Sequence, residues 1–151
     1  MIKFNLQKDQ SAIEGTIYDL VQESAWILYS FYRDLKKQNK DIADQFRKEM
    51  IDSGEQMFLS NENFSKLLNN IKYEKDPKSK IICEVRKSDP KSTKFDYEGD
   101  YKNLLHELII LIHRIYMSIK KQDEEAGQIY KDTLIQNLYI PFDEVDKEVE
   151  T

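Results

Sequence analysis

The sequence predicts a mostly α-helical protein with a minor β component (α+β), built as a tandem duplication of a strand–helix–helix unit with pseudo-twofold symmetry. Three observations predict this fold class. The chain has two long amphipathic segments, it has two short segments of alternating apolar residues, and it matches itself at an offset of 84 residues. At 151 residues, 40% of them apolar and 34% charged, the chain has the size and composition of one compact domain.

The self-match runs without a gap from residues 14–58 onto residues 98–142. Two unrelated amphipathic helices share a period, but they do not share a preceding glycine, a cap residue and two closing lysines, so we expect a duplication. The domain organisation is then repeat unit one (1–60), a helical connector and linker (61–79), repeat unit two (80–142) and an acidic tail (143–151), with both units sharing one core. The identical positions are Glu14 with Glu98, Gly15 with Gly99, Leu20 with Leu104, Glu23 with Glu107, Tyr32 with Tyr116, 36–38 with 120–122, Ile51 with Ile135 and Phe58 with Phe142.

Each unit begins with a short alternating segment, "IKFNL" at 2–6 and "IICEV" at 81–85, and we expect both to form strands. The segment "TKFDYEG" at 93–99 alternates as well. It is expected to form a hairpin with residues 81–86.

A long helix follows in each unit and runs to about Lys37 or Lys121, where cationic side chains suit the negative end of the helix dipole. Thr16 and Asp100 are expected to cap the start of these helices, and Asn39 and Asp123 the start of a shorter helix in each unit. The connector "SNENFSKLLNNI" at 60–71 predicts one more amphipathic helix. It has no expected equivalent in unit two, which ends in Pro141 and the acidic tail.

The outer faces of the two long helices carry the candidate interface residues. A solvent-facing stripe is normally rich in Lys and Glu, whereas these two are aromatic and semi-apolar, so we expect them to be covered. Either the two long helices lie back to back and bury both faces within the chain, or aromatic anchors on this face hold a homodimer or another partner. The candidates are Trp26, Tyr29 and Arg33 in unit one and Ile110, His113 and Met117 in unit two.

No catalytic or cofactor-binding motif is found in the sequence, and we expect neither an enzyme nor a cofactor. His106 and His113 are seven residues apart, which separates them by about 10.5 Å along a helix, too far for ligands of one zinc ion. We therefore expect no metal site. Glu23 and Glu107 coincide across the repeat, and we expect them to form salt bridges or caps rather than an acid–base pair.

The net charge of −5 is unevenly distributed. Residues 72–94 hold eight Lys or Arg against four acids, and this basic segment is the candidate anion-binding site, with Lys80, Arg86, Lys87 and Lys91 as its candidate residues. The alternative is a solvated, lysine-rich edge that discourages aggregation. Residues 143–151 hold five acids against one Lys, and we expect them to form a solvated terminus.

The expected function is that of a small, non-enzymatic cytoplasmic interaction protein, a phage or mobile-element accessory protein acting through a protein-binding surface, as a homo-oligomer (dimer). A lone cysteine, Cys83, fits a reducing cytoplasm, and no signal peptide or membrane span is evident. The alternatives are nucleic-acid or nucleotide binding through residues 72–94, and an acidic inhibitor of a nucleic-acid enzyme.

Overall fold

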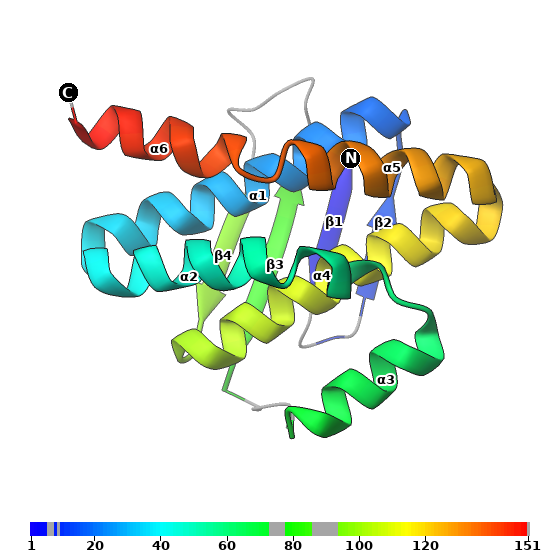
Figure 1. The fold of residues 1–151 in the computed structure, drawn as a ribbon, viewed down its shortest axis with the longest axis horizontal. Helices are drawn as coiled ribbons and strands as arrows, with labels where there is room; N and C mark the ends of the chain where they lie inside the picture. Colours follow the sequence, from blue (N-terminus) through cyan, green and yellow to red (C-terminus); the bar gives the residue numbers. More distant parts are fainter. Residues whose placement is uncertain (6–7, 9, 73–77, 86–93, 151) are drawn as a thin grey trace.

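The computed structural model of the chain describes residues 1–5, 8, 10–72, 78–85 and 94–150. Helices account for most of these residues and the strands form one small sheet, so the α+β prediction is confirmed (Figure 1). The elements in chain order are β1 (Ile2–Asn5), β2 (Gln10–Ile13), α1 (Ile17–Gln38), α2 (Lys40–Asp52), the 3-10 helix η1 (Gly54–Phe58), α3 (Asn61–Asn70), β3 (Lys80–Val85), β4 (Lys94–Glu98), α4 (Tyr101–Gln122), α5 (Glu124–Gln136) and α6 (Ile140–Glu150).

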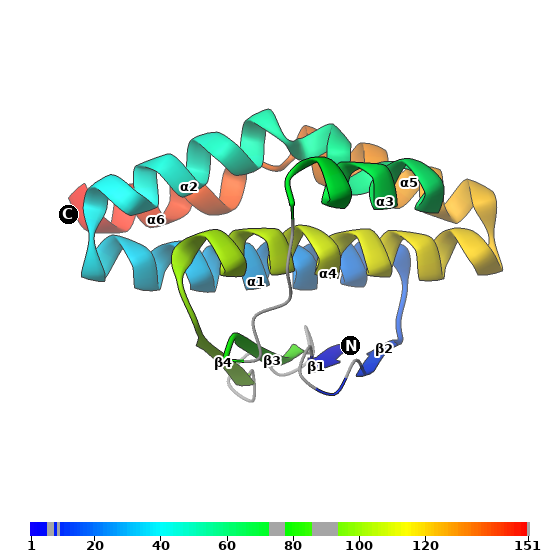
Figure 2. The same cartoon turned by 90° about the horizontal axis from the view of Figure 1, so that it is seen from below.

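The elements form three layers, which are seen edge-on in Figure 2. The sheet is the first layer, the long helices α1 and α4 are the second, and α2, α3, α5 and α6 are the third. The helices described cover one face of the sheet. Alternate residues of the strands point to that face and are buried, among them Ile2, Phe4, Ile81, Cys83 and Val85.

The sheet is antiparallel throughout, with the strand order β2-β1-β3-β4. The predicted strands at 2–6 and 81–85 are confirmed as β1 and β3, and they pair at the centre with Phe4 opposite Cys83. The predicted hairpin is confirmed as β3–β4. The strand β2 was not predicted, so a hairpin rather than a single strand precedes each long helix.

The four predicted helix caps are confirmed. Because Ser, Thr, Asn and Asp accept hydrogen bonds from the free amides of a first turn, they fix where a helix begins. Gly15 and Gly99, just before the long helices, have φ of +125° and +134°, a conformation that favours glycine. The side chains accept from the amides of Asp19 (Thr16), Asn103 (Asp100), Asp41 and Ile42 (Asn39), and Glu125 and Ala126 (Asp123).

The expectation of a solvated acidic terminus at 143–151 is wrong, because residues 140–150 form the helix α6. Pro141 is at the start of this helix, where its missing N–H costs no hydrogen bond. Phe142 and Val145 are fully buried and anchor α6. Two acids of this segment, Asp143 and Asp146, form ion pairs with Arg47 of α2.

The third-layer helices pack across the two halves of the chain. The hydroxyl groups of Ser24 in α1 and Tyr130 in α5 are hydrogen-bonded at 2.7 Å. In the other half, the rings of Phe58 in η1 and Tyr116 in α4 meet edge to face at 5.2 Å. Each long helix is therefore covered in part by short helices from the opposite half of the chain.

Candidate functional site

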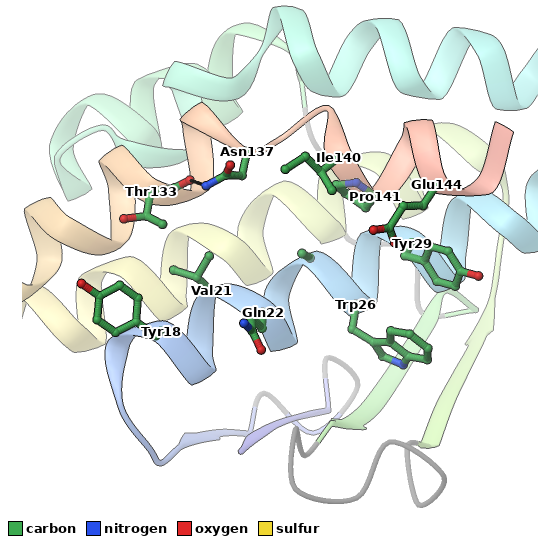
Figure 3. Close-up of a pocket in the computed structure, with 11 residues that line it drawn as sticks. Tyr18, Val21, Gln22, Trp26, Tyr29, Thr133, Asn137, Ile140, Pro141 and Glu144 are labelled. Carbon is green, nitrogen blue, oxygen red and sulfur yellow. Dashed lines mark hydrogen bonds between the residues drawn. The ribbon is translucent and has the colours of Figure 1, made fainter. Parts of the chain in front are cut away.

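The α1 groove is a hollow of about 400 Å³ between α1 and the junction of α5 with α6 (Figure 3). Its floor is the outer face of α1, and its facing wall begins at the end of α5 and continues into the first turn of α6. Tyr18 lies toward one end of the groove and Trp26 toward the other. The lining residues are Tyr18, Val21, Gln22, Ala25, Trp26 and Tyr29 from α1, and Thr133, Asn137, Ile140, Pro141 and Glu144 from the facing wall.

The helical period explains why these side chains reach the groove. Leu20, Ile27 and Leu28 face the core and are buried, and this fixes the rotation of α1. Trp26 then projects outward, as the sequence predicted. On the facing wall, the side-chain amide of Asn137 donates to the carbonyl oxygen of Thr133 at 2.9 Å, which ties the end of α5 to its last turn.

The α1 groove exposes large apolar side chains. Tyr18, Trp26 and Ile140 are 67%, 36% and 37% exposed, respectively. Exposed apolar groups gathered in a concave site are typical of binding surfaces. Among the lining residues that the structure describes, Glu144 is the one that carries a charge.

Trp26 and Tyr29 form an aromatic pair at one end of the groove, with ring centroids 5.1 Å apart and planes 22° from parallel. The Tyr29 hydroxyl donates to the Glu148 carboxylate at 2.5 Å, and the Arg33 guanidinium lies 5.3 Å above the Tyr29 ring. Burial and the Glu148 carboxylate raise the pKa of Tyr29. The predicted residues Trp26, Tyr29 and Arg33 are therefore neighbours, but Tyr29 is held by α6 while Trp26 remains open to solvent.

The corresponding residues of α4 are covered within the chain. His113 lies flat against Phe64 of α3, with ring centroids 3.7 Å apart. Its Nδ1 and Nε2 lie 3.1 Å from the Met57 carbonyl oxygen and 3.2 Å from Asn61 Oδ1. Ile110 is buried and Met117 is half-buried.

The two long helices therefore do not bury their outer faces against each other, and that alternative is wrong. The outer face of α4 is covered by η1 and α3, and Tyr29 on the outer face of α1 is covered by α6. The physical reason is that short helices cover these outer faces. The sequence-based alternative was that each long helix would be covered by the other.

The candidate anion-binding segment is described only in part. Lys80 is half-buried, and its ammonium lies 2.6 Å from the Asp96 carboxylate on the neighbouring strand, which raises its pKa. Arg86, Lys87 and Lys91 lie outside the described residues. A mixed-charge hollow that was not predicted lies beside the end of α4, lined by Arg114, Lys120, Lys121 and Glu124, among others.

The two repeated glutamates are buried at equivalent places. Glu23 Oε2 lies 2.8 Å from the amino group of Met1, and Glu107 is fully buried. Among the residues that the structure describes, no three His, Cys, Asp or Glu side chains are grouped as metal ligands would be. Within the same described part of the chain, no helix has the length and apolar character needed to span a membrane.

Comparison of the chain with protein-family models, curated proteins and solved structures finds no significant match. The function is therefore inferred from the geometry of the α1 groove.

Proposed function

We propose that this chain is an interaction protein that binds a protein partner through the α1 groove. The observation that carries the proposal is an indole ring, 36% exposed, in a groove whose floor is a helix fixed by the core. Tryptophan and tyrosine dominate the energetics of protein interfaces because they contribute large contact areas at a low entropic cost. A rigid floor adds to affinity, because little conformational freedom is lost on binding.

We also propose that the chain arose as a tandem duplication with pseudo-twofold symmetry. The matching caps support this. Asn39 has φ −158° and ψ 106°, and Asp123, 84 residues later, has φ −155° and ψ 111°. Thr16 and Asp100 match as closely, at −74°, 162° and −77°, 160°. An experimental structure in which residues 14–52 and 98–136 do not superpose would overturn the duplication.

Site-specific photocrosslinking in the cells that produce the protein tests the binding function. Gln22 is exposed and lines the groove, so a photoreactive phenylalanine derivative at position 22 would contact whatever occupies it. We expect a discrete adduct whose mass identifies the partner or a second copy. The matched control is the same derivative at Ile129, which is 41% exposed on α5 and does not line the groove.

An adduct at position 22 that is absent at position 129 supports the proposal. Equal labelling at both positions, or none at either, would overturn it. A change of Trp26 to Ala should reduce the adduct at position 22, because it removes the largest side chain in the groove. It should leave the thermal unfolding of the free protein nearly unchanged, since the ring is not enclosed by the core.

A further inference from the structure

The α4 groove is a second hollow of about 410 Å³, and it lies on α4. Its floor is formed by Lys102, Leu105, His106 and Ile109 of α4. Its facing wall comes from the end of α2 and from η1, in the opposite half of the chain. The wall residues are Glu49, Ser53 and Gln56. Leu67 and Leu68 of α3, with Ile71 directly after its end, complete the lining.

The two grooves are built from matching positions. Both have a long helix from one half of the chain as floor and the junction after a short helix from the other half as wall. The lining residues that coincide at the 84-residue offset are Lys102 with Tyr18, Leu105 with Val21, His106 with Gln22, Ile109 with Ala25, Thr133 with Glu49, Asn137 with Ser53 and Ile140 with Gln56. The same type of site therefore occurs twice in the fold.

The helix α3 makes the difference between the two grooves. Its apolar residues Phe64, Leu67 and Leu68, with the C-cap residue Ile71, follow the spacing i, i+3, i+4, i+7 of an amphipathic helix. Leu67, Leu68 and Ile71 line the α4 groove, and Phe64 is 5% exposed because it packs on His113. In the α1 groove, every described lining residue belongs to α1 or to the α5–α6 wall. At the 84-residue offset, Glu148 of α6 on Tyr29 takes the place of Phe64 on His113, but no described residue takes the places of Leu67, Leu68 and Ile71.

We infer that the α1 groove binds an amphipathic helix of a partner protein, in the position that residues 67–71 take beside the α4 groove. This inference rests on the proposed function and specifies the partner's conformation and charge. An apolar stripe with the spacing of α3 would pack on Trp26 and Ile140, as helices pack into hydrophobic grooves generally. Because Glu144 is the one charged residue among the described lining residues, the helix is expected to carry a Lys or Arg beside its stripe.

A second copy of this chain fits the groove less well than a different protein. The α3 helix of a second copy is already packed on its own α4, with Phe64 against His113 and with Leu67 lining the α4 groove. If two copies met groove to groove, each Glu144 would face the groove of the other copy, where the described lining residues include no cation to pair with it. The occupant is therefore assigned to a separate, basic amphipathic helix.

A designed peptide tests this inference directly. The probe is a capped peptide of about 16 residues with Phe, Leu, Leu and Ile at the α3 spacing on a lysine-rich helical frame. Trp26 is the single tryptophan of the chain, so its emission should shift to the blue when the peptide covers it. Titration calorimetry on the full-length protein should give binding at least about tenfold tighter than that of a scrambled peptide of the same composition.

Two exposed positions of the groove supply the variants. Ile140→Asp should weaken peptide binding at least about tenfold, while Ile129→Asp, at an exposed position of α5 outside the groove, should leave it unchanged. Glu144→Lys should reverse the preference between a lysine-framed and a glutamate-framed peptide. Circular dichroism of each variant establishes that it is folded, which is expected because both side chains are exposed.

The outcomes separate this inference from the proposed function. Equal binding of the scrambled peptide, or no effect of Ile140→Asp, overturns the helix assignment. A concentration-dependent dimer that Ile140→Asp abolishes also overturns it, because the occupant would then be a second copy. If crosslinking at position 22 captures a partner through a strand or a loop, the proposed function stands and the helix assignment falls. If neither crosslinking nor peptide binding is observed, both fall.

Discussion

Arg47 and Asp146 are 99 residues apart in the sequence, and their side chains are joined by a hydrogen bond of 2.5 Å. Arg47 also donates to Asp143 at 2.6 Å. Asp146 accepts in addition from the Tyr32 hydroxyl at 2.7 Å, and the Lys36 ammonium lies 3.2 Å away. This cluster connects α1, α2 and α6, and it holds the helix that forms part of the α1 groove wall.

Asp146→Asn should lower the free energy of unfolding by about 1–2 kcal/mol, because the amide replaces charge-assisted hydrogen bonds at a partly exposed site. Burial opposes ionisation of Asp146, but the hydrogen bonds from Tyr32 and Lys36 outweigh it and lower the pKa. Its stabilising contribution is therefore present above the ordinary pKa of about 3.9 and is lost as pH falls through the lower native value.

Urea unfolding of both proteins at several pH values measures this. The difference in stability between wild type and Asp146→Asn should be constant near neutral pH and should shrink below about pH 4. Asp52→Asn, an exposed carboxylate at the end of α2, is the control and should change stability by less than about 0.5 kcal/mol. If the stability difference between wild type and Asp146→Asn persists undiminished at low pH, the ionised Asp146 carboxylate is not its source.

Acidification should destabilise the fold through His113. Burial lowers its pKa, and the charge of Arg114 lowers it further, while the hydrogen bond with the Met57 carbonyl opposes the shift. Because the native pKa lies below the ordinary value of about 6.5, stability is full above pH 6.5 and declines as pH falls below it. His106 is also shifted down, mainly by burial. NMR titration should therefore find both imidazoles ionising below pH 6.5.

The variants His113→Gln and His106→Gln separate the contributions of the two histidines to the pH dependence of stability. His113→Gln should reduce the loss of stability between about pH 7 and pH 5, and His106→Gln should leave the contribution of His113 in place. A ring of His113 that titrates above 6.5 would refute the buried stacking arrangement with Phe64.

Gly127→Ala should lower thermal stability, although alanine is favoured over glycine by about 1 kcal/mol in a helix interior. A Cβ atom at Gly127 would lie 2.9 Å from the Lys120 Cβ and 3.0 Å from the Lys120 Cα, so α5 would be forced away from α4. Gln128→Ala, at an exposed position one residue later, is the control and should have little effect. Melting followed by circular dichroism measures both, and a more stable Gly127→Ala protein would contradict this packing.

Oligonucleotides should not bind the wild-type protein near 150 mM salt, a condition that weakens contacts made only to phosphates. The described residue of the candidate anion site, Lys80, is already paired with Asp96. Fluorescence anisotropy with single- and double-stranded probes measures binding. Tight, salt-sensitive binding that is lost when Lys80, Arg86, Lys87 and Lys91 are replaced by Ala would instead support the nucleic-acid function.

Local signals were sufficient to predict the helices that begin with a cap. A side chain such as Asn39 acts on the amides two and three residues later, so its effect can be read from the neighbouring sequence. The strand β2 was missed because "QSAI" has one β-branched residue, Ile13, and no aromatic residue, and its position depends on pairing with β1. The helix α6 was missed although its signals were present, namely Pro141 in the first turn and Phe142 and Val145 three residues apart.

Only one side of the α1 groove, the outer face of α1, was predicted from the sequence. The helical period correctly placed Trp26 on the outer face of α1, because that depends on residues within a few turns. The facing wall at Asn137 and Ile140 comes from more than 100 residues further along the chain. No local pattern encodes that packing, since it depends on how the two halves cross. The coverage of His113 by Phe64 was unpredictable for the same reason.

The buried thiol of Cys83 has a practical consequence. Cys83 is 1% exposed at the centre of the sheet, and burial raises its pKa to about 12. A thiol reagent attacks the thiolate, so the native state should be inert and labelling should occur only when β1 and β3 separate. Because the chain has one cysteine, the unmodified protein carries its own reporter. The labelling rate at increasing denaturant should then reveal whether the sheet opens alone or only with the whole fold.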